Sequence, residues 1–283
     1  MYVRYFIYFM LFTNMLFSVE YTQNDEYIAT LKPYNSKSGL YDDKHVIQGI
    51  ASYNDSWIVV QTIKNKQLLV NILDENGTSY ADSLITFPSH GADLSIRMSN
   101  NKKNLYLYTQ GKHRNGIVQL SSSIEAFRLK VKKSIPLTLS STIPSISENK
   151  AYFAVKSRDS IYIYRYVDIA KNTNPLKIFS FILARKQRAK GQWFQGIAMK
   201  DGLIYCLTGD NTLKGKKYLY IYDSYGRVNK SYTLTTGIGF SKSIGKKWEL
   251  EGLAFKENIL YTTVMAKDKK HYMRLYKILS LSK

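Results

Sequence analysis

Short runs of apolar residues, separated by turns that contain Gly and Asp, occupy most of the chain. The run after Gln195 is joined to the next by Asp201-Gly202, a pair typical of a tight hairpin. Further along, aromatic and aliphatic residues alternate as in a strand packed on one face. The pattern predicts a four-stranded antiparallel unit with strands at 195–199, 203–208, 218–222 and 229–236.

Similar units recur along the chain at spacings of 42 to 56 residues, which is the size of a propeller blade. The last unit has only three strands, whereas 26–34 is a lone strand near the N-terminus. That strand can complete the final unit and remove two exposed sheet edges. We therefore predict an all-β fold, a five-bladed β-propeller of four-stranded antiparallel blades closed by an N-terminal strand. The expected blades are 48–87, 90–131, 144–183, 195–236, and 251–279 plus 26–34.

The first residues have the pattern of an export signal. Residues 1–4 are short and basic, 5–17 are mainly apolar, and Ser18 is small. An uncleaved anchor is the alternative, but this run is shorter than the roughly 20 residues that span a bilayer. We expect a signal peptide at 1–18, a single propeller domain at 19–283 with no transmembrane segment, and a secreted or periplasmic protein.

The formal net charge of +20 is unevenly distributed over the predicted loops. Loops between second and third strands share one face with the connections between blades, among which we count 132–143. This face carries 22 Lys and Arg against six Asp and Glu, whereas the opposite turns carry seven against eight. A face of one sign attracts polyanions, although solvated lysines without a ligand are the alternative. The predicted basic face includes Lys64, Lys66, Lys112, Arg114, Lys214, Lys216, Lys217, Lys246, Lys247, Lys267, Lys269 and Lys270.

Polar residues open four of the five predicted inner strands, which line the central channel. The opening residues are Gln48, His90, Pro144, Gln195 and Glu251, each followed by Gly or Ser, so the backbones can crowd together. Two tryptophans just upstream provide stacking platforms for a sugar. We expect ligand binding by Gln48, His90, Trp193, Gln195, Trp248 and Glu251.

Two other interpretations of these residues stay open. The polar side chains can bond to each other and to channel water, and the tryptophans can pack between blades. A cation held by Glu251 and His90 is a further alternative, and no other cofactor is expected.

Three short motifs carry a resemblance to a known family. Gln48-Gly-Ile-Ala51, the His90-Gly91 pair and Glu249-Leu-Glu-Gly-Leu-Ala254 resemble the β-propeller shared by phage tail receptor-binding proteins, teichoic acid biosynthesis protein C and helveticin J-like bacteriocins. The resemblance covers about 26–279, and the third blade departs from it with Pro144-Ser-Ile-Ser147. It implies a five-bladed propeller that recognises an anionic envelope glycan and has no defined catalytic site.

A propeller hydrolase, either a glycosidase or a phosphoesterase with its site at the channel mouth, is the main alternative to a binding protein. A glycosidase needs two carboxylates facing its substrate, and the candidates are Glu251, Glu249 and Asp93, with the direction of Glu249 left open. Phosphate-binding loops, zinc spacings and Ser-His-Asp sets do not occur in the sequence. Nucleic acid would suit basic loops, but export argues against it. We expect a monomeric binding protein for an anionic glycan or similar polyanion, with a bacteriocin-like role as one form; Cys206 is expected to be a buried core thiol.

Overall fold

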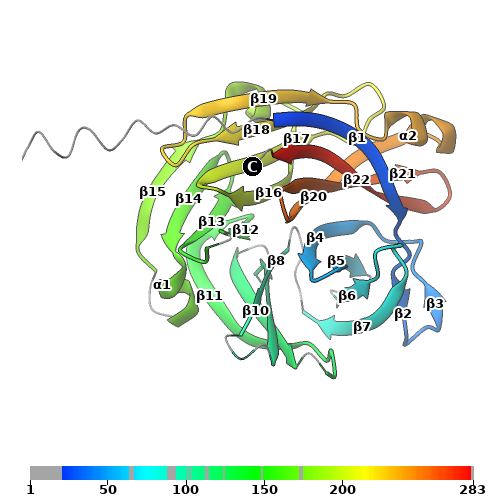
Figure 1. Cartoon of the computed structure of the whole chain (residues 1–283), viewed down its shortest axis with the longest axis horizontal. Coiled ribbons are helices and arrows are strands. Elements are labelled where there is room, and N and C mark those ends of the chain that lie inside the picture. Colours follow the sequence, from blue (N-terminus) through cyan, green and yellow to red (C-terminus); the bar gives the residue numbers. More distant parts are fainter. Residues whose placement is uncertain are drawn as a thin grey trace, which may run out of the picture.

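Five four-stranded antiparallel sheets surround a common centre in a computed structural model of the chain, so the fold is a five-bladed β-propeller as predicted (Figure 1). The structure describes residues 21–63, 67–87, 94–99, 101, 103–111, 115–123, 125–147, 149–171 and 175–281. The predicted signal peptide lies outside these residues. None of the helices in this described part is long and apolar enough to cross a membrane.

The first three blades follow the chain from the inner strand outward. The first contains β4 (Ile47–Tyr53), β5 (Ser56–Ile63), β6 (Gln67–Leu73) and β7 (Ser79–Thr86). The second contains β8 (Ser95–Met98), β9 (Asn104–Gln110), β10 (Asn115–Ser123) and β11 (Lys130–Ser140). The third contains β12 (Ile143–Ile146), β13 (Tyr152–Ser157), β14 (Ser160–Arg165) and β15 (Lys177–Ile182), with the short helix α1 (Tyr166–Lys171) before β15.

The last two blades are joined by longer connections that contain short helices. The fourth blade contains β16 (Trp193–Lys200), β17 (Leu203–Gly209), β18 (Lys217–Tyr222) and β19 (Val228–Leu234). The fifth contains β20 (Lys247–Lys256), β21 (Ile259–Lys267) and β22 (His271–Leu281). The 3-10 helix η2 (Arg185–Arg188) precedes the fourth blade, and α2 (Ile238–Ile244) precedes the fifth.

An N-terminal strand closes the ring, as the sequence predicts. β1 (Tyr21–Thr30) pairs antiparallel with β22 and forms the outermost strand of the fifth blade. It begins earlier than the predicted 26–34, because its first residues are polar and resemble a loop, and it ends earlier, at Thr30. Two register shifts along the pair bend this strand as it follows the edge of the sheet.

The second blade extends further than predicted. Residues 132–140 were expected to form a connection, but they belong to β11, which pairs with β10. Lysines dominate its first half because the outer strand of a blade exposes one face to water. Pro136 lies at an exposed position of this edge strand, where its missing N–H breaks no ladder bond.

Inner strands crowd against each other at glycines, as expected. A Cβ on Gly196 would lie 2.8 Å from the backbone carbon of Gly252. Gly252 itself has a φ of 69° and lies close to the backbone of β4. Any side chain at these two positions would therefore push the blades apart. Between the blades, apolar side chains form the core, and it includes the thiol of Cys206.

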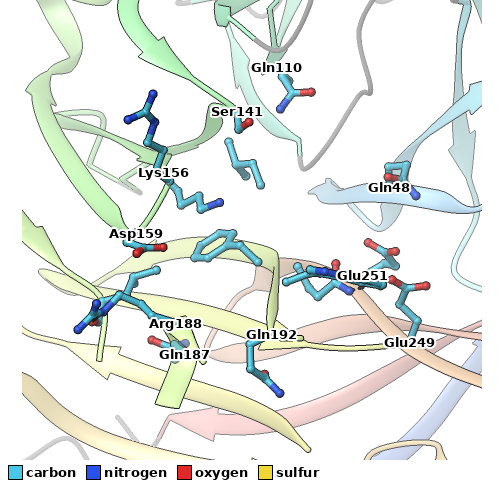
Figure 2. A pocket seen from close by; sticks show the side chains of 16 residues that line it. Gln48, Gln110, Ser141, Lys156, Asp159, Gln187, Arg188, Gln192, Glu249 and Glu251 are labelled. Carbon is cyan, nitrogen blue, oxygen red and sulfur yellow. Dashed lines mark hydrogen bonds between the residues drawn. The ribbon is translucent and has the colours of Figure 1, made fainter. Parts of the chain in front are cut away.

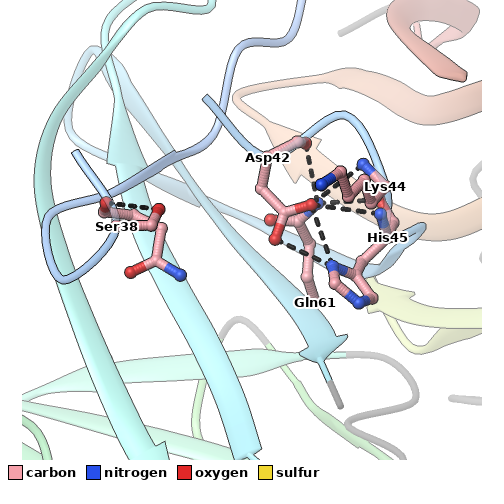
Figure 3. A network of polar contacts seen from close by, with 6 residues as sticks. Ser38, Asp42, Lys44, His45 and Gln61 are labelled. Carbon is pink, nitrogen blue, oxygen red and sulfur yellow. Dashed lines mark hydrogen bonds and ion pairs between the residues drawn. The ribbon is translucent and has the colours of Figure 1, made fainter. Parts of the chain in front are cut away.

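The connection from the ring-closing strand to the first blade is fixed by one aspartate. β2 (Tyr34–Asn35) and β3 (Leu40–Tyr41) form a small hairpin before it. The Asp42 carboxylate then accepts hydrogen bonds from the backbone N–H groups of Lys44 and His45 and lies 2.9 Å from Nδ1 of His45 (Figure 3). Gln61 on β5 donates to the His45 carbonyl oxygen at 2.8 Å. The chain is thus held where it enters the innermost strand β4.

Candidate functional site

A cavity of about 540 Å³ lies at one mouth of the central channel (Figure 2). Gln48 on β4, Gln195 on β16 and Glu251 on β20 line it, because each stands near the start of an inner strand. Trp193 lines it as well. The structure therefore brings together four of the six residues predicted to bind ligand.

Trp193 offers an accessible aromatic surface at this cavity. It is the first residue of β16, and 52% of its surface is exposed. Its cross-strand partner is Gly209, which has no side chain to cover the indole. Next to it, Phe194 also lines the cavity and has the Lys156 ammonium 5.0 Å from its ring centre. Such a surface can pack against the apolar face of a sugar.

Trp248 is not part of the cavity, so its prediction as a stacking platform is wrong. It is 2% exposed and packs among core residues between the fourth and fifth blades. Its indole N–H donates to the Thr236 carbonyl oxygen at 2.8 Å. The reason is that β20 begins at Lys247, earlier than expected, so side chains already alternate at this point. Trp248 faces the core, and Glu249 faces the channel.

Glu249 and Glu251 form the acidic wall of the cavity. They lie two residues apart on β20, so both side chains point to the same face. Gln195 donates from Nε2 to Oε1 of Glu249 at 2.9 Å. Burial raises the pKa of Glu249, although Gln195, Lys247 and Lys217 oppose this shift. The sequence had left the direction of Glu249 open.

Lys156, Arg158 and Arg188 form the basic wall of the same cavity. Lys156 stands on β13, Arg158 in the following turn, and Arg188 at the end of η2, where its Nε donates to the Leu183 carbonyl oxygen at 2.7 Å. Burial lowers the pKa of Lys156, while the nearby Asp159 raises it. The sequence analysis did not name these residues individually, although two of them lie in loops assigned to the basic face.

The structure exposes most of the described lysines of the predicted basic face but not all of them. Lys217 is buried, makes a 2.6 Å ion pair with Asp210 and lies 4.2 Å from the ring centre of Trp248, so its place on a surface was predicted wrongly. Lys214, Lys216, Lys246 and Lys269 are exposed, Lys247 and Lys267 are partly exposed, and the exposed Lys270 pairs with Asp43 at 2.7 Å. The remaining predicted residues, Lys64, Lys66, Lys112, Arg114 and the site residue His90, lie outside the described residues.

Three of the loops that carry these lysines lie together. The backbone N–H of Trp248 donates to the Asn211 carbonyl oxygen in the β17–β18 loop. The backbone N–H of Lys246 donates to the carbonyl oxygen of Lys267 at the end of β21. Gln192, which lines the cavity, donates from Nε2 to the Lys216 carbonyl oxygen at 3.0 Å. The loops that carry the exposed lysines are therefore hydrogen-bonded to one another, and Lys216 connects them to the cavity.

The described residues contain no group of three or more His, Cys, Asp or Glu side chains that could hold a metal ion. Because His90 lies outside the described residues, the alternative in which Glu251 and His90 hold a cation stays a prediction.

Neither a protein-family model nor a curated protein sequence matches this chain. Solved structures do share its fold. The tail fiber of Staphylococcus aureus phage P68 has a TM-score of 0.69 at 16% identity, over 94% of this chain and 54% of the fiber chain. The chain thus spans about half the length of that fiber.

Two enzymes are also similar in fold. A glycoside hydrolase family 43 arabinoxylan arabinofuranohydrolase from Bacillus subtilis has a TM-score of 0.53 at 12% identity, over 90% of this chain and 69% of its own. A GH130 family glycoside hydrolase that targets β-1,2 mannosidic linkages in Candida mannan has a TM-score of 0.51 at 9% identity, over 91% and 93%. At these identities the likeness establishes the β-propeller fold and nothing finer.

Proposed function

We propose that the protein is a secreted or periplasmic binding protein that recognises an anionic cell-envelope glycan at the mouth of its channel. The cavity of about 540 Å³ carries the proposal, because it combines an exposed indole, cationic side chains and several amides. That volume lies within the roughly 300–1,000 Å³ typical of small-molecule sites. It suits one or two sugar units of a longer polymer.

Each group in the cavity has a defined part in this proposal. The Trp193 ring packs against the apolar face of a sugar, while Arg188 and Arg158 bind a phosphate or carboxylate through charge-assisted hydrogen bonds. Gln48 and Gln195 bind hydroxyl groups. Exposed lysines beside the cavity attract the polymer over a longer range.

The fold relationship to a phage tail fiber supports binding at a cell surface as the role of this propeller. Teichoic acid is one anionic envelope polymer that fits the proposal, and a bacteriocin-like activity is one form that binding could take. We propose a monomer with no cofactor, and no specific nucleic-acid partner.

A propeller hydrolase is the second candidate, because enzymes that act on glycans share the fold. The acidic wall favours binding over hydrolysis. Glu249 and Glu251 lie two residues apart on one face of β20, on the same wall of the cavity, whereas the two carboxylates of a glycosidase face each other across the substrate, roughly 5–9.5 Å apart. Asp159 also lines the cavity, on its basic wall, and Asp93, the third carboxylate expected from the sequence, lies outside the described residues. Release of reducing ends from a bound polymer, lost in Glu251→Gln, would favour the hydrolase instead.

The test is a calorimetric comparison of Trp193→Ala and Arg188→Gln with the unaltered protein. The probes are a sugar-phosphate polymer, a uronic-acid polymer, a neutral glucan and single-stranded DNA. We expect binding to at least one anionic glycan, weakened by tenfold or more by either substitution because each removes a contact worth about 1.5 kcal/mol or more.

Matched controls keep the same chemical changes away from the cavity. Tyr225→Ala removes an aromatic ring that is 74% exposed in another part of the fold, and Arg185→Gln removes an exposed arginine from the same 3-10 helix. Both controls should bind like the unaltered protein. Equal losses in site and control variants, or a preference for DNA over every glycan, would contradict the proposal.

A further inference from the structure

A groove of about 730 Å³ lies between the third and fourth blades, apart from the channel-mouth cavity. β16 runs from one site to the other. Trp193 and Gln195 near its start line the cavity, whereas Met199 and Lys200 at its end line the groove. None of the described residues lines both. The groove is therefore a separate site, and its volume also lies in the range typical of ligand sites.

Two tyrosine rings are exposed at this groove. Tyr152 is the first residue of β13 in the third blade and is 45% exposed. Tyr225 lies in the β18–β19 turn of the fourth blade and is 74% exposed. One ring thus comes from each of the two blades that border the groove. Such rings offer apolar faces on which the C–H groups of a sugar ring can pack.

The turn that carries Tyr225 is held by its own side chains. The Asp223 carboxylate accepts hydrogen bonds from the backbone N–H groups of Tyr225 at 2.8 Å and Arg227 at 2.9 Å, and it pairs with the Arg227 guanidinium at 2.7 Å. That guanidinium also lies 5.2 Å from the centre of the Tyr225 ring. Gly226 has a φ of 78° and packs against Phe181 with no room for a side chain. Because the turn is already ordered, ligand binding costs little conformational entropy there.

The turn before Tyr152 is fixed in a similar way. Oδ1 of Asn149 accepts hydrogen bonds from the backbone N–H of Ala151 at 3.0 Å and from the Ser147 hydroxyl at 2.8 Å. Oγ of Ser147 accepts one from the backbone N–H of Tyr152 at 2.9 Å. The Asn149 carboxamide is thereby held at the groove, where its NH₂ group can donate to a ligand hydroxyl.

The rest of the groove combines an apolar floor with a carboxylate. Its floor is formed by side chains of the third and fourth blades, namely Ile163, Phe179, Met199, Leu203 and Ile204. Asp201 in the β16–β17 turn is exposed and also lines the groove. A ligand in the groove would therefore meet aromatic faces, aliphatic surface and a hydrogen-bond acceptor together.

An acetamido group on a sugar matches this combination. A plain hexose can pack on the two rings but has no apolar group for the floor. The acetamido group adds a methyl group, whose burial is favourable, and an N–H that the Asp201 carboxylate can accept. A purely apolar ligand would fill the floor but would cover Asp201 and Asn149 without bonding to them, which costs free energy.

We infer that the groove is a second sugar site, which binds an N-acetylated amino sugar. Tyr152 and Tyr225 pack against the sugar rings, Asn149 binds a hydroxyl, and Asp201 accepts the amide N–H. The methyl group lies on the apolar floor. This inference goes beyond the proposed function and does not depend on it, because the two sites are built from different residues.

The experiment compares two tetrasaccharides of the same β-1,4 linkage, one of N-acetylglucosamine and the other of glucose. They differ in the group at C2 of each sugar unit. Binding is measured by calorimetry, with octyl glucoside as a probe for an apolar chain. We expect the acetamido tetrasaccharide to bind at least about tenfold more tightly than the glucose form, because it adds a buried methyl group and a hydrogen bond to a charged acceptor.

Substitutions at the groove identify the residues responsible. Tyr225→Ala should weaken binding of the acetamido tetrasaccharide by about tenfold. Tyr80→Ala is its matched control, since Tyr80 is 59% exposed on β7 in the first blade. If Tyr225→Ala melts at a lower temperature than the unaltered protein, Tyr152→Ala serves for the same comparison.

Asp201→Asn tests the carboxylate separately. Asp201 has a φ of 51°, a conformation that Asn also tolerates, so the turn should persist. The variant should lose part of the preference for the acetamido form, because a neutral amide oxygen is a weaker acceptor. Asp55→Asn changes an exposed aspartate in the corresponding β4–β5 turn of the first blade and should keep the full preference.

The outcomes separate the two sites. Trp193→Ala and Arg188→Gln should bind the acetamido tetrasaccharide normally, and Tyr225→Ala should bind the uronic-acid polymer normally. Equal binding of the two tetrasaccharides, tighter binding of octyl glucoside than of either, or equal losses in the Tyr225 and Tyr80 variants would overturn the inference and leave the proposed function standing.

Discussion

Glu249 is a carboxyl group whose raised pKa has a consequence for stability. A carboxyl with a raised pKa in the folded state stabilises the fold when it is protonated, below its usual pKa near 4.3. This contribution is lost as the pH rises through the folded-state pKa, so the ionised group costs stability near neutral pH. Glu249→Gln cannot ionise and still accepts the hydrogen bond from Gln195.

We therefore expect Glu249→Gln to raise the melting temperature at about pH 7 and to leave it nearly unchanged at about pH 4. Thermal unfolding at the two pH values measures the difference, with Glu257→Gln as the control for loss of one surface charge. An equal change at both pH values would mean that the ionisation of Glu249 does not contribute.

Single residues also show what the sequence could and could not predict about the site. Gln48, Gln195 and Glu251 were found because each opens a repeat, so their common position followed from the fold. The position of Trp248 was predicted wrongly because a shift of one residue along a strand moves a side chain from the core to the channel face. Lys217 was taken for a surface lysine because its ion-pair partner, Asp210, lies in a loop whose path no local pattern reveals.

At the scale of elements, β1 is the strand on which ring closure depends. Its removal would leave the outer edge of β22 without a partner, and the last blade would no longer connect both ends of the chain. We expect a variant that lacks residues 21–30 to lose about 5 kcal/mol or more, comparable with the whole stability of many domains.

Urea unfolding of this variant is compared with that of a chain beginning at Tyr21, which keeps β1. A synthetic peptide of residues 21–30 should restore part of the lost stability when added in excess. Identical unfolding of the two chains would show that β1 does not close the ring.

Elements with one exposed face were the hardest to predict. The strands of the fourth blade, rich in Leu, Ile and Tyr, were placed within a few residues of their observed bounds. β11 was shortened because its first half is mainly lysine and its second half contains Pro136. An outer strand needs apolar residues on one face only, so charge and proline there do not end it.

At the scale of the whole molecule, the five repeats were enough to predict a closed ring. Four of them contain the four strands of a blade, and the N-terminal strand completes the fifth. The cavity could be predicted only in part. Its basic wall comes from β13 and η2 and its acidic wall from β20, so these residues meet only through the curvature of the ring. Sequence spacing shows that inner strands converge, but not which loop side chains reach over the mouth.

The distribution of charge over the molecule leads to the last prediction. Lys214, Lys216 and Lys246 are exposed on loops beside the cavity, whereas Lys103, Lys150 and Lys171 are exposed in other parts of the fold. If one face attracts the polymer, reversing the first three to Glu should weaken binding of a sugar-phosphate polymer by tenfold or more and flatten its salt dependence. Reversing the second three changes the net charge equally and should have much less effect.

Because the cavity itself is unaltered, the first variant should still prefer the same polymer over others once the salt concentration is low. The measurement is affinity at two salt concentrations for both triple variants, and equal losses would show that only the total charge of the protein matters.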